Sequence, residues 1–215
     1  MQGWRKTMED SHISEMNLLN GKIHIFGVFD GHGGEEVAQY VKKNFTKEIK
    51  KSPFFISMDM ENALIENFLL IDKLLIEPEG KSELRQLYKI SNERVELKEL
   101  KELKELEEFN DKEKKADKDI HRLNKQIYNN DYNPKSHEEC NIAMISGCTA
   151  HACIIDEVQK KLFFANSGDS RGVLCKNGKS YAMSVDHKPD LEMEKLRIYK
   201  ADGFVSEGRV KGKKI

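Results

Sequence analysis

The sequence Val28-Phe29-Asp30-Gly31-His32-Gly33-Gly34 (VFDGHGG) joins an apolar run to a segment with helical periodicity. One or two glycines are enough for a turn from a strand into a helix, but this turn also carries an acid and an imidazole. Two interpretations are open for these residues by themselves. They form either a turn with a helix cap or a site for a metal ion and a phosphate group, and the surrounding sequence has to decide.

Two strands are expected before this turn and two helices after it. Residues 10–19 and 22–30 are strand-like, and the Asn20-Gly21 pair between them is a strong hairpin signal. Helical periodicity follows over residues 35–50 and 59–77, with Pro78 and Gly80 expected to end the second helix. The predicted core positions are Val37, Ala38, Val41, Phe45 and Ile49 in the first helix, and Leu64, Ile65, Phe68, Leu69, Leu75 and Ile76 in the second.

A strongly charged segment interrupts the globular pattern. Residues 91–119 contain 11 acidic and 8 basic side chains, and the leucines recur every three residues at Leu97, Leu100, Leu103 and Leu106. Steps of three turn successive side chains around a helix, whereas a coiled-coil seam needs alternating steps of three and four. We therefore expect residues 81–138 to be a solvated insertion, helical in part and disordered in its Asn-rich end, rather than a dimerisation element.

Strand-like sequence returns at Ile145. Residues 147–156 and 160–168 fit buried strands, and two more strands are expected around the turn at residues 176–178. Residues 189–201 look helical, and Gly203 ends that helix. A strand pair, a helix pair and then further strands indicate an α+β domain rather than a doubly wound sheet. We expect a single domain over residues 1–215.

Charge and hydropathy argue against two classes of partner. The net charge is −1, so no general basic surface for nucleic acid or an anionic membrane is expected. No apolar run approaches the roughly 18 residues of a membrane helix. The N-terminal sequence MQGWRKTMEDSH lacks the apolar centre of a signal peptide. These features predict a soluble protein of the cytoplasm or nucleus, without nucleic-acid or membrane partners.

The cysteines fit the same compartment. The chain contains Cys140, Cys148, Cys153 and Cys175, without a Cys-x-x-Cys pair. Cys148 and His151 are three residues apart in a strand-like run, which places their side chains on opposite faces. Free thiols in a reducing compartment are the favoured interpretation, and a disulfide or a zinc site is the alternative.

Two other segments place acids where a cation could bind. Glu9 and Asp10 are adjacent carboxylates, which repel each other unless a cation or base lies between them. In a strand they face opposite sides, so one could bind a metal while the other holds a metal-bound water. Arg5 is close by in sequence, and its guanidinium suits a phosphate group. Asp169 lies between glycines at a strand end. The alternatives are a surface strand with scattered charge and an ordinary hairpin turn.

Six segments together resemble one family, the metal-dependent serine/threonine protein phosphatases of type 2C. In chain order they are MQGWRKTMEDSH, FGVFDGHGGEEVAQYV, GCTAHACII, LFFANSGDSRGVLCKNGK, DHKPDLEMEKLRI and GFVSEGRVKG. The resemblance covers residues 1–76 and 145–212 and is broken by the charged insertion. It implies a four-layer α-β-β-α sandwich of two antiparallel sheets flanked by helices.

The resemblance also implies roles for individual residues. Asp30 would bridge two Mn²⁺ or Mg²⁺ ions, and Glu9 and the Gly31 carbonyl would hold one of them. A hydroxide bound to the metals would attack the phosphorus atom of a phosphoprotein. The remaining implied roles are metal-bound water orientation for Asp10, phosphate binding for Arg5, protonation of the leaving oxygen for His32, a weaker third metal site for Asp169 and a structural role for Thr149.

The chain departs from the family pattern at both ends. The family supplies two further metal-binding aspartates from later segments, and this sequence stops at Lys213-Lys214-Ile215 before either of them. A strand that precedes the GWR segment in the family is absent as well. The expectation is an incomplete, monomeric phosphatase domain with one compromised metal site, weakly active or inactive on phosphoprotein substrates. The alternative is a pseudophosphatase, or a phosphoprotein-binding or interaction module without turnover.

Overall fold

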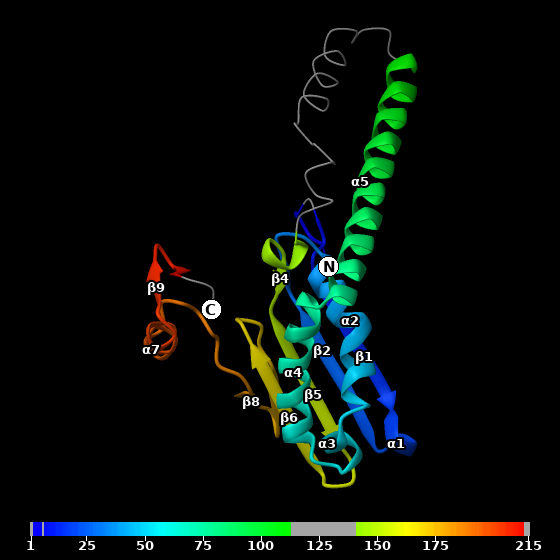
Figure 1. Cartoon of the computed structure of the whole chain (residues 1–215). Coiled ribbons are helices and arrows are strands. Elements are labelled where there is room, and N and C mark those ends of the chain that lie inside the picture. Colours follow the sequence, from blue (N-terminus) through cyan, green and yellow to red (C-terminus); the bar gives the residue numbers. More distant parts are fainter. Residues whose placement is uncertain (1, 6, 113–140, 213–215) are drawn as a thin grey trace.

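A computed structural model describes residues 2–5, 7–112 and 141–212 of the chain. Its centre is a four-stranded antiparallel sheet in the order β1-β2-β5-β6 (Figure 1). These strands are β1 (Ser11–Asn17), β2 (Ile23–Phe29), β5 (Ala150–Asp156) and β6 (Lys161–Ser167). The sheet therefore joins strands from both sides of the charged segment, with Ile25 opposite Ile154.

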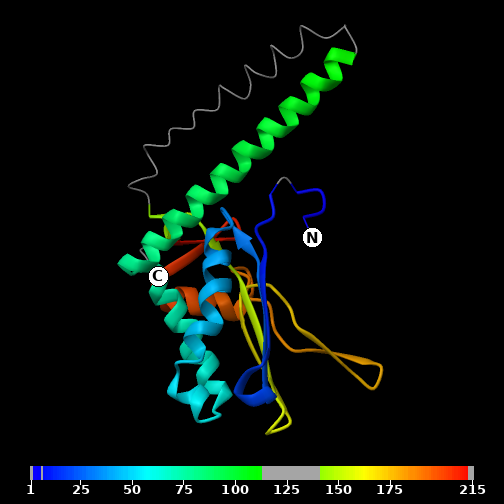
Figure 2. The ribbon, with the colours of Figure 1, turned by 90° about the vertical axis from the view of Figure 1, so that its right-hand side faces the viewer.

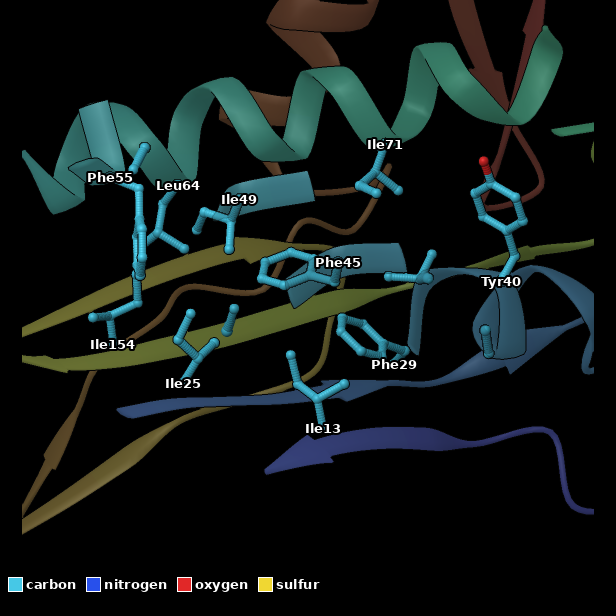
Figure 3. Packing of buried hydrophobic residues seen from close by; sticks show 14 of the residues in the cluster. Ile13, Ile25, Phe29, Tyr40, Phe45, Ile49, Phe55, Leu64, Ile71 and Ile154 are labelled. Carbon is cyan, nitrogen blue, oxygen red and sulfur yellow. The ribbon is translucent and has the colours of Figure 1, made fainter. Parts of the chain in front are cut away.

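Helices cover one face of this sheet (Figures 1 and 2). They are α2 (Glu36–Ile49), α3 (Pro53–Ile56), α4 (Met60–Ile76) and the start of α5 (Pro78–Lys112). Alternate residues of β2 face them and are buried. Phe29 and Phe45 meet with their ring centroids 5.7 Å apart, and Figure 3 shows this pair at the centre of the core. The core thus lies between one helix layer and one sheet.

The core positions predicted for α2 are all buried, whereas those predicted for α4 are only partly right. Leu64 is buried, and Phe68 and Leu75 pack against the core. The predictions for Ile65, Leu69 and Ile76 are wrong, because these side chains are 54%, 70% and 57% exposed. The buried positions of α4 are Met60, Ala63, Leu64, Asn67 and Ile71, which share one helical stripe. Asn67 occupies a place on this stripe because its side-chain amide donates to the Phe45 carbonyl, at 3.1 Å.

Pro78 and Gly80 were expected to end the second helix, and they lie in the first turn of a new helix. Helix α4 ends at Ile76 as expected, but α5 starts at Pro78, a residue that suits the first turn of a helix. A Cβ at Gly80 would lie 1.9 Å from the Leu74 carbonyl oxygen, so this glycine permits the close packing of the two helices. Leu84, in the second turn of α5, is fully buried in the core. Further along, α5 projects from the layered part (Figures 1 and 2).

The helical character expected for the charged segment is confirmed as far as Lys112. The rest of that segment, including its predicted disordered end, lies outside the described residues. Arg94 of α5 forms an ion pair with Glu35 at 3.6 Å, just before α2 begins. Helix α5 therefore passes beside the turn that contains Asp30 and His32 before it leaves the body.

The connection between β1 and β2 is longer than a two-residue hairpin. The chain passes through α1 (Leu18–Gly21), and Asn17, Leu19 and Asn20 all have positive φ angles. A bridge between Leu18 and Ile23 closes this turn. The two strands are confirmed, but the Asn20-Gly21 pair forms only part of a left-handed four-residue connection.

The remaining strands form two-stranded pairs. They are β3 (Gly31–His32) with β4 (Gly147–Cys148), β7 (Val173–Lys176) with β8 (Lys179–Ala182), and β9 (Gly203–Ser206) with β10 (Arg209–Gly212). A 3₁₀ turn, η2 (Ile142–Met144), precedes β4, and α7 (Glu192–Lys200) precedes β9. The expected α+β class with antiparallel sheets is confirmed. Within the described part of the chain, none of the helices combines the length and apolar character that a membrane span requires.

Candidate metal and phosphate site

Strand register brings the predicted site segments to one end of the central sheet. Ser11 at the start of β1 lies opposite Phe29 at the end of β2. Val28 lies opposite His151 near the start of β5, and Ala150 lies opposite Ser167 at the end of β6. The chain therefore leaves the sheet at the same end of its strands at Glu9 and Asp10, at the Asp30 turn and at the Asp169 loop.

Gly31 lies against the backbone of Glu9. A Cβ at position 31 would be 2.4 Å from the Glu9 carbonyl oxygen, closer than real atoms approach. Only glycine fits there, and this contact brings together two residues that the sequence predicts for the same metal. The Glu9 carboxylate accepts a hydrogen bond from the Thr7 hydroxyl at 2.9 Å.

His32 lies on the short strand β3, opposite Gly147 of β4. A Cβ at Gly147 would be 2.7 Å from His32 Nε2, so the missing side chain makes room for the imidazole ring. The ring borders a cavity of about 650 Å³ between the helix layer and the sheet, where Ser146, Cys148 and Asp72 also contribute to the wall. His32 is therefore held at the edge of the sheet with its ring accessible.

The Asp30 carboxyl is surrounded by other acids. Burial raises its pKa above the usual value, and the nearby Asp10 and Asp169 carboxylates raise it further, while His32 acts in the opposite direction. Asp10 and Asp169 therefore both lie near Asp30, although the three aspartates come from three separate segments. Like charges in such proximity favour binding of a cation or a proton, which is the property expected of a metal site.

Thr149 connects the Asp30 turn to the Asp169 loop. Its backbone N–H donates to the Asp30 carbonyl at 2.8 Å, and its hydroxyl accepts from the Asp30 N–H at 3.3 Å. The same hydroxyl is 2.6 Å from the Ser170 hydroxyl. Three hydrogen bonds through one residue therefore fix the relative positions of two acid-bearing segments.

Three charged residues near Asp169, namely Arg171, Asp186 and Lys188, received no role from the sequence. Arg171 donates two hydrogen bonds to Asp186, at 2.7 and 2.8 Å. These bonds, together with the charges of Arg171 and Lys188, lower the pKa of Asp186 to about 2. Lys188 Nζ lies 3.6 Å from Asp169 and 3.5 Å from Asp186. The DHKP segment contains the charges of Asp186 and Lys188, but only the folded structure shows that they lie beside Arg171 and Asp169.

Glu36 is a second acid whose position the sequence does not reveal. Its side chain is only 4% exposed, in the first turn of α2. Burial raises its pKa, while hydrogen bonds from its own backbone N–H and from Ser146 oppose that rise. A Cβ at Gly34 would collide with its carboxylate, so the glycine provides the space for this acid. The Glu36 carboxylate thus packs against Gly34, in the turn that follows His32.

Arg5 is the predicted site residue with the least support from its surroundings. It is exposed, and its backbone N–H donates to the Gln2 carbonyl at 3.2 Å. The ion pairs found among the described residues do not include Arg5. The structure therefore places Arg5 in the segment that leads to Glu9, without joining its guanidinium to the acids.

The donor set suits a hard divalent cation. Carboxylates and a backbone carbonyl are the ligands that Mg²⁺ and Mn²⁺ prefer. Within residues 2–5, 7–112 and 141–212, no three His, Cys, Asp or Glu side chains lie close enough to hold a metal unaided. Mg²⁺ commonly uses one or two carboxylates and retains several waters, so the converging aspartates fit such an ion in part.

The cysteines near the site do not offer a soft-metal alternative. Cys148, Cys153 and Cys175 are free thiols, and Cys140 lies outside the described residues. Burial, with a contribution from Asp30, raises the pKa of Cys148 to about 12. A thiol with this pKa stays protonated at neutral pH and is a poor zinc ligand. The interpretation of these three cysteines as free thiols is confirmed.

Comparisons with solved structures agree with the fold. A crystal structure of a phosphatase from Toxoplasma gondii superposes with a TM-score of 0.52 at 19% sequence identity, covering 96% of this chain and 58% of that one. At this identity the likeness shows the fold alone. It is an α+β fold with antiparallel sheets, as the sequence predicts.

Sequence comparisons give the family. The Protein phosphatase 2C family matches residues 1–84 and 79–213. The Paramecium tetraurelia protein called probable protein phosphatase 2C 2 is 42% identical over 212 residues, which are 99% of this chain and 53% of that protein. Probable protein phosphatase 2C 21 of Arabidopsis thaliana is 35% identical over 227 residues, covering 99% of this chain and 55% of that protein. The chain belongs to the protein phosphatase 2C family, and it spans about half the length of these curated relatives.

Proposed function

We propose that this chain carries part of the catalytic site of a metal-dependent protein serine/threonine phosphatase. The observation that supports this proposal best is the position of Asp10 and Asp169 near Asp30 at one end of the sheet, where burial, and then these two carboxylates, raise the pKa of Asp30. Family membership supports the same reaction class. The substrates would be phosphoproteins, and the domain would act as a monomer in the cytoplasm or nucleus.

The acids would act by holding divalent cations. Asp30 would bridge two sites, and Glu9 with the Gly31 carbonyl would complete one of them, which agrees with the tight contact between these two residues. Two Mn²⁺ or Mg²⁺ ions would polarise the phosphate group and lower the pKa of the attacking water. Asp10 would orient that water, and Asp169 would contribute to a weaker third site.

His32 would complete the reaction by proton transfer. Imidazoles commonly serve as general acids, and the absence of a side chain at Gly147 leaves room for the His32 ring at this end of the sheet. The departing serine or threonine oxygen would receive this proton as the bond to phosphorus breaks. Arg5 would bind the phosphate oxygens from the segment before Glu9, as a planar cation suits that task.

We expect the 215-residue chain to be weakly active or inactive when assayed alone. A phosphoryl transfer that uses two metals requires several carboxylates around them, and no three potential ligand side chains lie together in the described residues. The same observation favours a second candidate function, in which the chain binds phosphoproteins without turnover.

Phosphate release tests both candidates. The 215-residue chain and its Asp30→Asn variant are incubated with a phosphoserine peptide and a phosphothreonine peptide, with Mn²⁺, with Mg²⁺ or with EDTA. Slow release that requires Mn²⁺ or Mg²⁺ and is lost in Asp30→Asn supports the phosphatase. Peptide binding without release and without metal dependence supports the binding module. Release that continues in EDTA contradicts the proposed metal-dependent mechanism.

A further inference from the structure

His151 is a buried side chain that the proposed reaction does not use. It lies on β5, is 7% exposed, and sits directly opposite Asn166 of β6. Its Nδ1 is 3.0 Å from the Asn166 side-chain oxygen. Asn166 precedes Asp169 by three residues, so this contact reaches the base of the loop that carries one of the candidate metal ligands.

The hydrogen bonds around Asn166 define the orientation of both side chains. The Asn166 amide nitrogen lies 3.0 Å from the Gly168 carbonyl oxygen and 3.1 Å from that of Val185. Carbonyl oxygens only accept, so both amide hydrogens are used and the side-chain oxygen must face His151. That oxygen also only accepts, and therefore the hydrogen of the imidazole is on Nδ1.

The Asn166 amide thus joins two loops that carry charged residues. Gly168 begins the Asp169 loop, and Val185 directly precedes Asp186. A further pair of contacts connects the same loops, because the His187 N–H donates to the Gly168 carbonyl at 3.0 Å and the Gly168 N–H lies 3.4 Å from His187 Nδ1. Without the orientation that His151 imposes, the amide of Asn166 could rotate and lose both carbonyl contacts.

The other end of the Asp169 loop also meets His151. A Cβ at Gly172 would lie 2.3 Å from His151 Nε2, so the ring rests directly on the backbone that follows Arg171. Within the described residues Nε2 is buried without a hydrogen-bond partner, a cost that a purely apolar side chain would avoid. The Gly172 N–H in turn donates to the Ser184 hydroxyl at 3.1 Å. One imidazole therefore contacts the chain on both sides of Asp169.

We propose that His151 is a positioning residue for Asp169, acting through its hydrogen bond to Asn166 and its packing on Gly172. The part of this inference that concerns metal binding rests on the proposed function. The geometric part, that His151 orders the loops around Asp169 and Asp186, does not depend on any metal.

Two replacements separate the hydrogen bond from simple packing. His151→Leu fills much of the space but cannot donate to Asn166. His151→Asn keeps an N–H donor near the position of Nδ1 and should preserve the contact. Ile154→Val is the control, because Ile154 is a fully buried residue of the same strand and belongs to the hydrophobic core. It lowers stability without touching the Asp169 loop.

Hydrogen exchange of the full 215-residue chain without metal gives the first measurement. We expect His151→Leu to speed exchange in residues 166–172 and 184–188 by about tenfold, the factor that corresponds to losing one buried hydrogen bond. His151→Asn and Ile154→Val should leave exchange in these segments near the wild-type rate. Equal acceleration in His151→Asn and His151→Leu, or none in His151→Leu, overturns the proposal. If His151→Leu does not fold, Gly172→Ala tests the packing of the His151 ring on Gly172 and should accelerate exchange in both segments. Unchanged exchange in that variant overturns the proposal too.

The second measurement is the binding of Mn²⁺, followed by titration calorimetry. We expect His151→Leu to weaken Mn²⁺ binding several-fold and His151→Asn to restore it, which a loss of general stability would not do. Unchanged Mn²⁺ affinity in His151→Leu overturns the link from His151 to Asp169. If the wild-type chain binds no Mn²⁺, the proposed metal-dependent function fails on this point, while the exchange experiment still decides whether His151 positions the loop.

Discussion

Gly31 and Glu9 are in such close contact that a single methyl group at position 31 would lie 2.4 Å from the Glu9 carbonyl oxygen. Glu9 precedes β1 and Gly31 follows β2, so the antiparallel pairing of these strands creates the contact. The glycine is therefore required by an approach of two backbones, and the same approach places two candidate ligands side by side. Backbone packing and site assembly cannot be separated at this point.

Replacement of Gly31 by alanine should disturb the site more than it disturbs the fold. We expect Gly31→Ala to push the Glu9 segment away and to abolish Mn²⁺ binding in a calorimetric titration. The matched control is Gly178→Ala, at a turn residue with a φ of +72° and no atom within 4 Å of the added Cβ. That control should cost about 1 kcal/mol of stability through its backbone angle and leave Mn²⁺ binding unchanged. Equal metal affinity in both variants would contradict the role of the contact.

Removal of the Asp30 charge should stabilise the metal-free protein. Burial and the neighbouring Asp10 and Asp169 raise the pKa of Asp30, so its ionised form is disfavoured in the folded state. A raised pKa of an acid means that folding stability is lost as the pH rises from the unfolded pKa of about 4 through the folded value. Asp30→Asn should therefore raise the melting temperature at pH 7 in EDTA. The corresponding gain in the free energy of unfolding should be less than about 1 kcal/mol, because solvent screens the repulsion.

The pH dependence provides the control for that prediction. At pH 3, where the raised pKa of Asp30 leaves this carboxyl protonated, wild type and Asp30→Asn should melt at nearly the same temperature. With Mn²⁺ present the order should reverse, because the wild-type carboxylate gains a cation. A variant that is less stable than wild type in EDTA at pH 7 would show that the Asp30 carboxylate forms stabilising contacts instead.

The start of helix α5 should contribute more to the stability of the fold than the part that projects. Leu84 is fully buried, whereas Leu100 of the same helix is 54% exposed. Leu84→Ala should lower the free energy of unfolding by about 2–5 kcal/mol, as for other buried leucines. Leu100→Ala should change it by less than about 0.5 kcal/mol. Urea unfolding of both variants checks this, and a large effect at Leu100 would reveal a contact in the projecting part.

The sequence allowed much of this architecture to be predicted, for physical reasons. Helix α2 has a narrow apolar stripe, so periodicity identified its core face correctly. Helix α4 is apolar on most of its circumference, and one of its buried positions is Asn67, whose contact with the Phe45 carbonyl no periodicity reveals. The Asn20-Gly21 pair indicated a turn but not its length, since four residues with left-handed or near-helical backbone share the connection.

The site was predictable only in part, because some of its residues have a local sequence signature and others do not. Residues with an evident chemical signature, such as Asp30 and His32, could be recognised from their local sequence. Lys188 and His151 carry no such signature, because their importance depends on partners far away in the chain. Lys188 meets Asp169 across a loop, and His151 meets Asn166 only after β5 and β6 have paired. Contacts that depend on strand register need the folded structure.

The ion pair between Arg171 and Asp186 should stabilise the fold in a defined pH range. The hydrogen bonds from Arg171 lower the pKa of Asp186 to about 2. A lowered pKa of an acid means that the stabilisation is fully present above the unfolded pKa of about 3.9 and is lost as the pH falls toward the folded value. The difference in melting temperature between wild type and Arg171→Gln should therefore be constant between pH 5 and 7 (approximate limits) and shrink below about pH 4. Lys200→Gln, at an exposed lysine in the last turn of α7, is the charge-matched control and should show no such step. A difference that grows on acidification would mean that Arg171 stabilises the fold through a contact other than the Asp186 carboxylate.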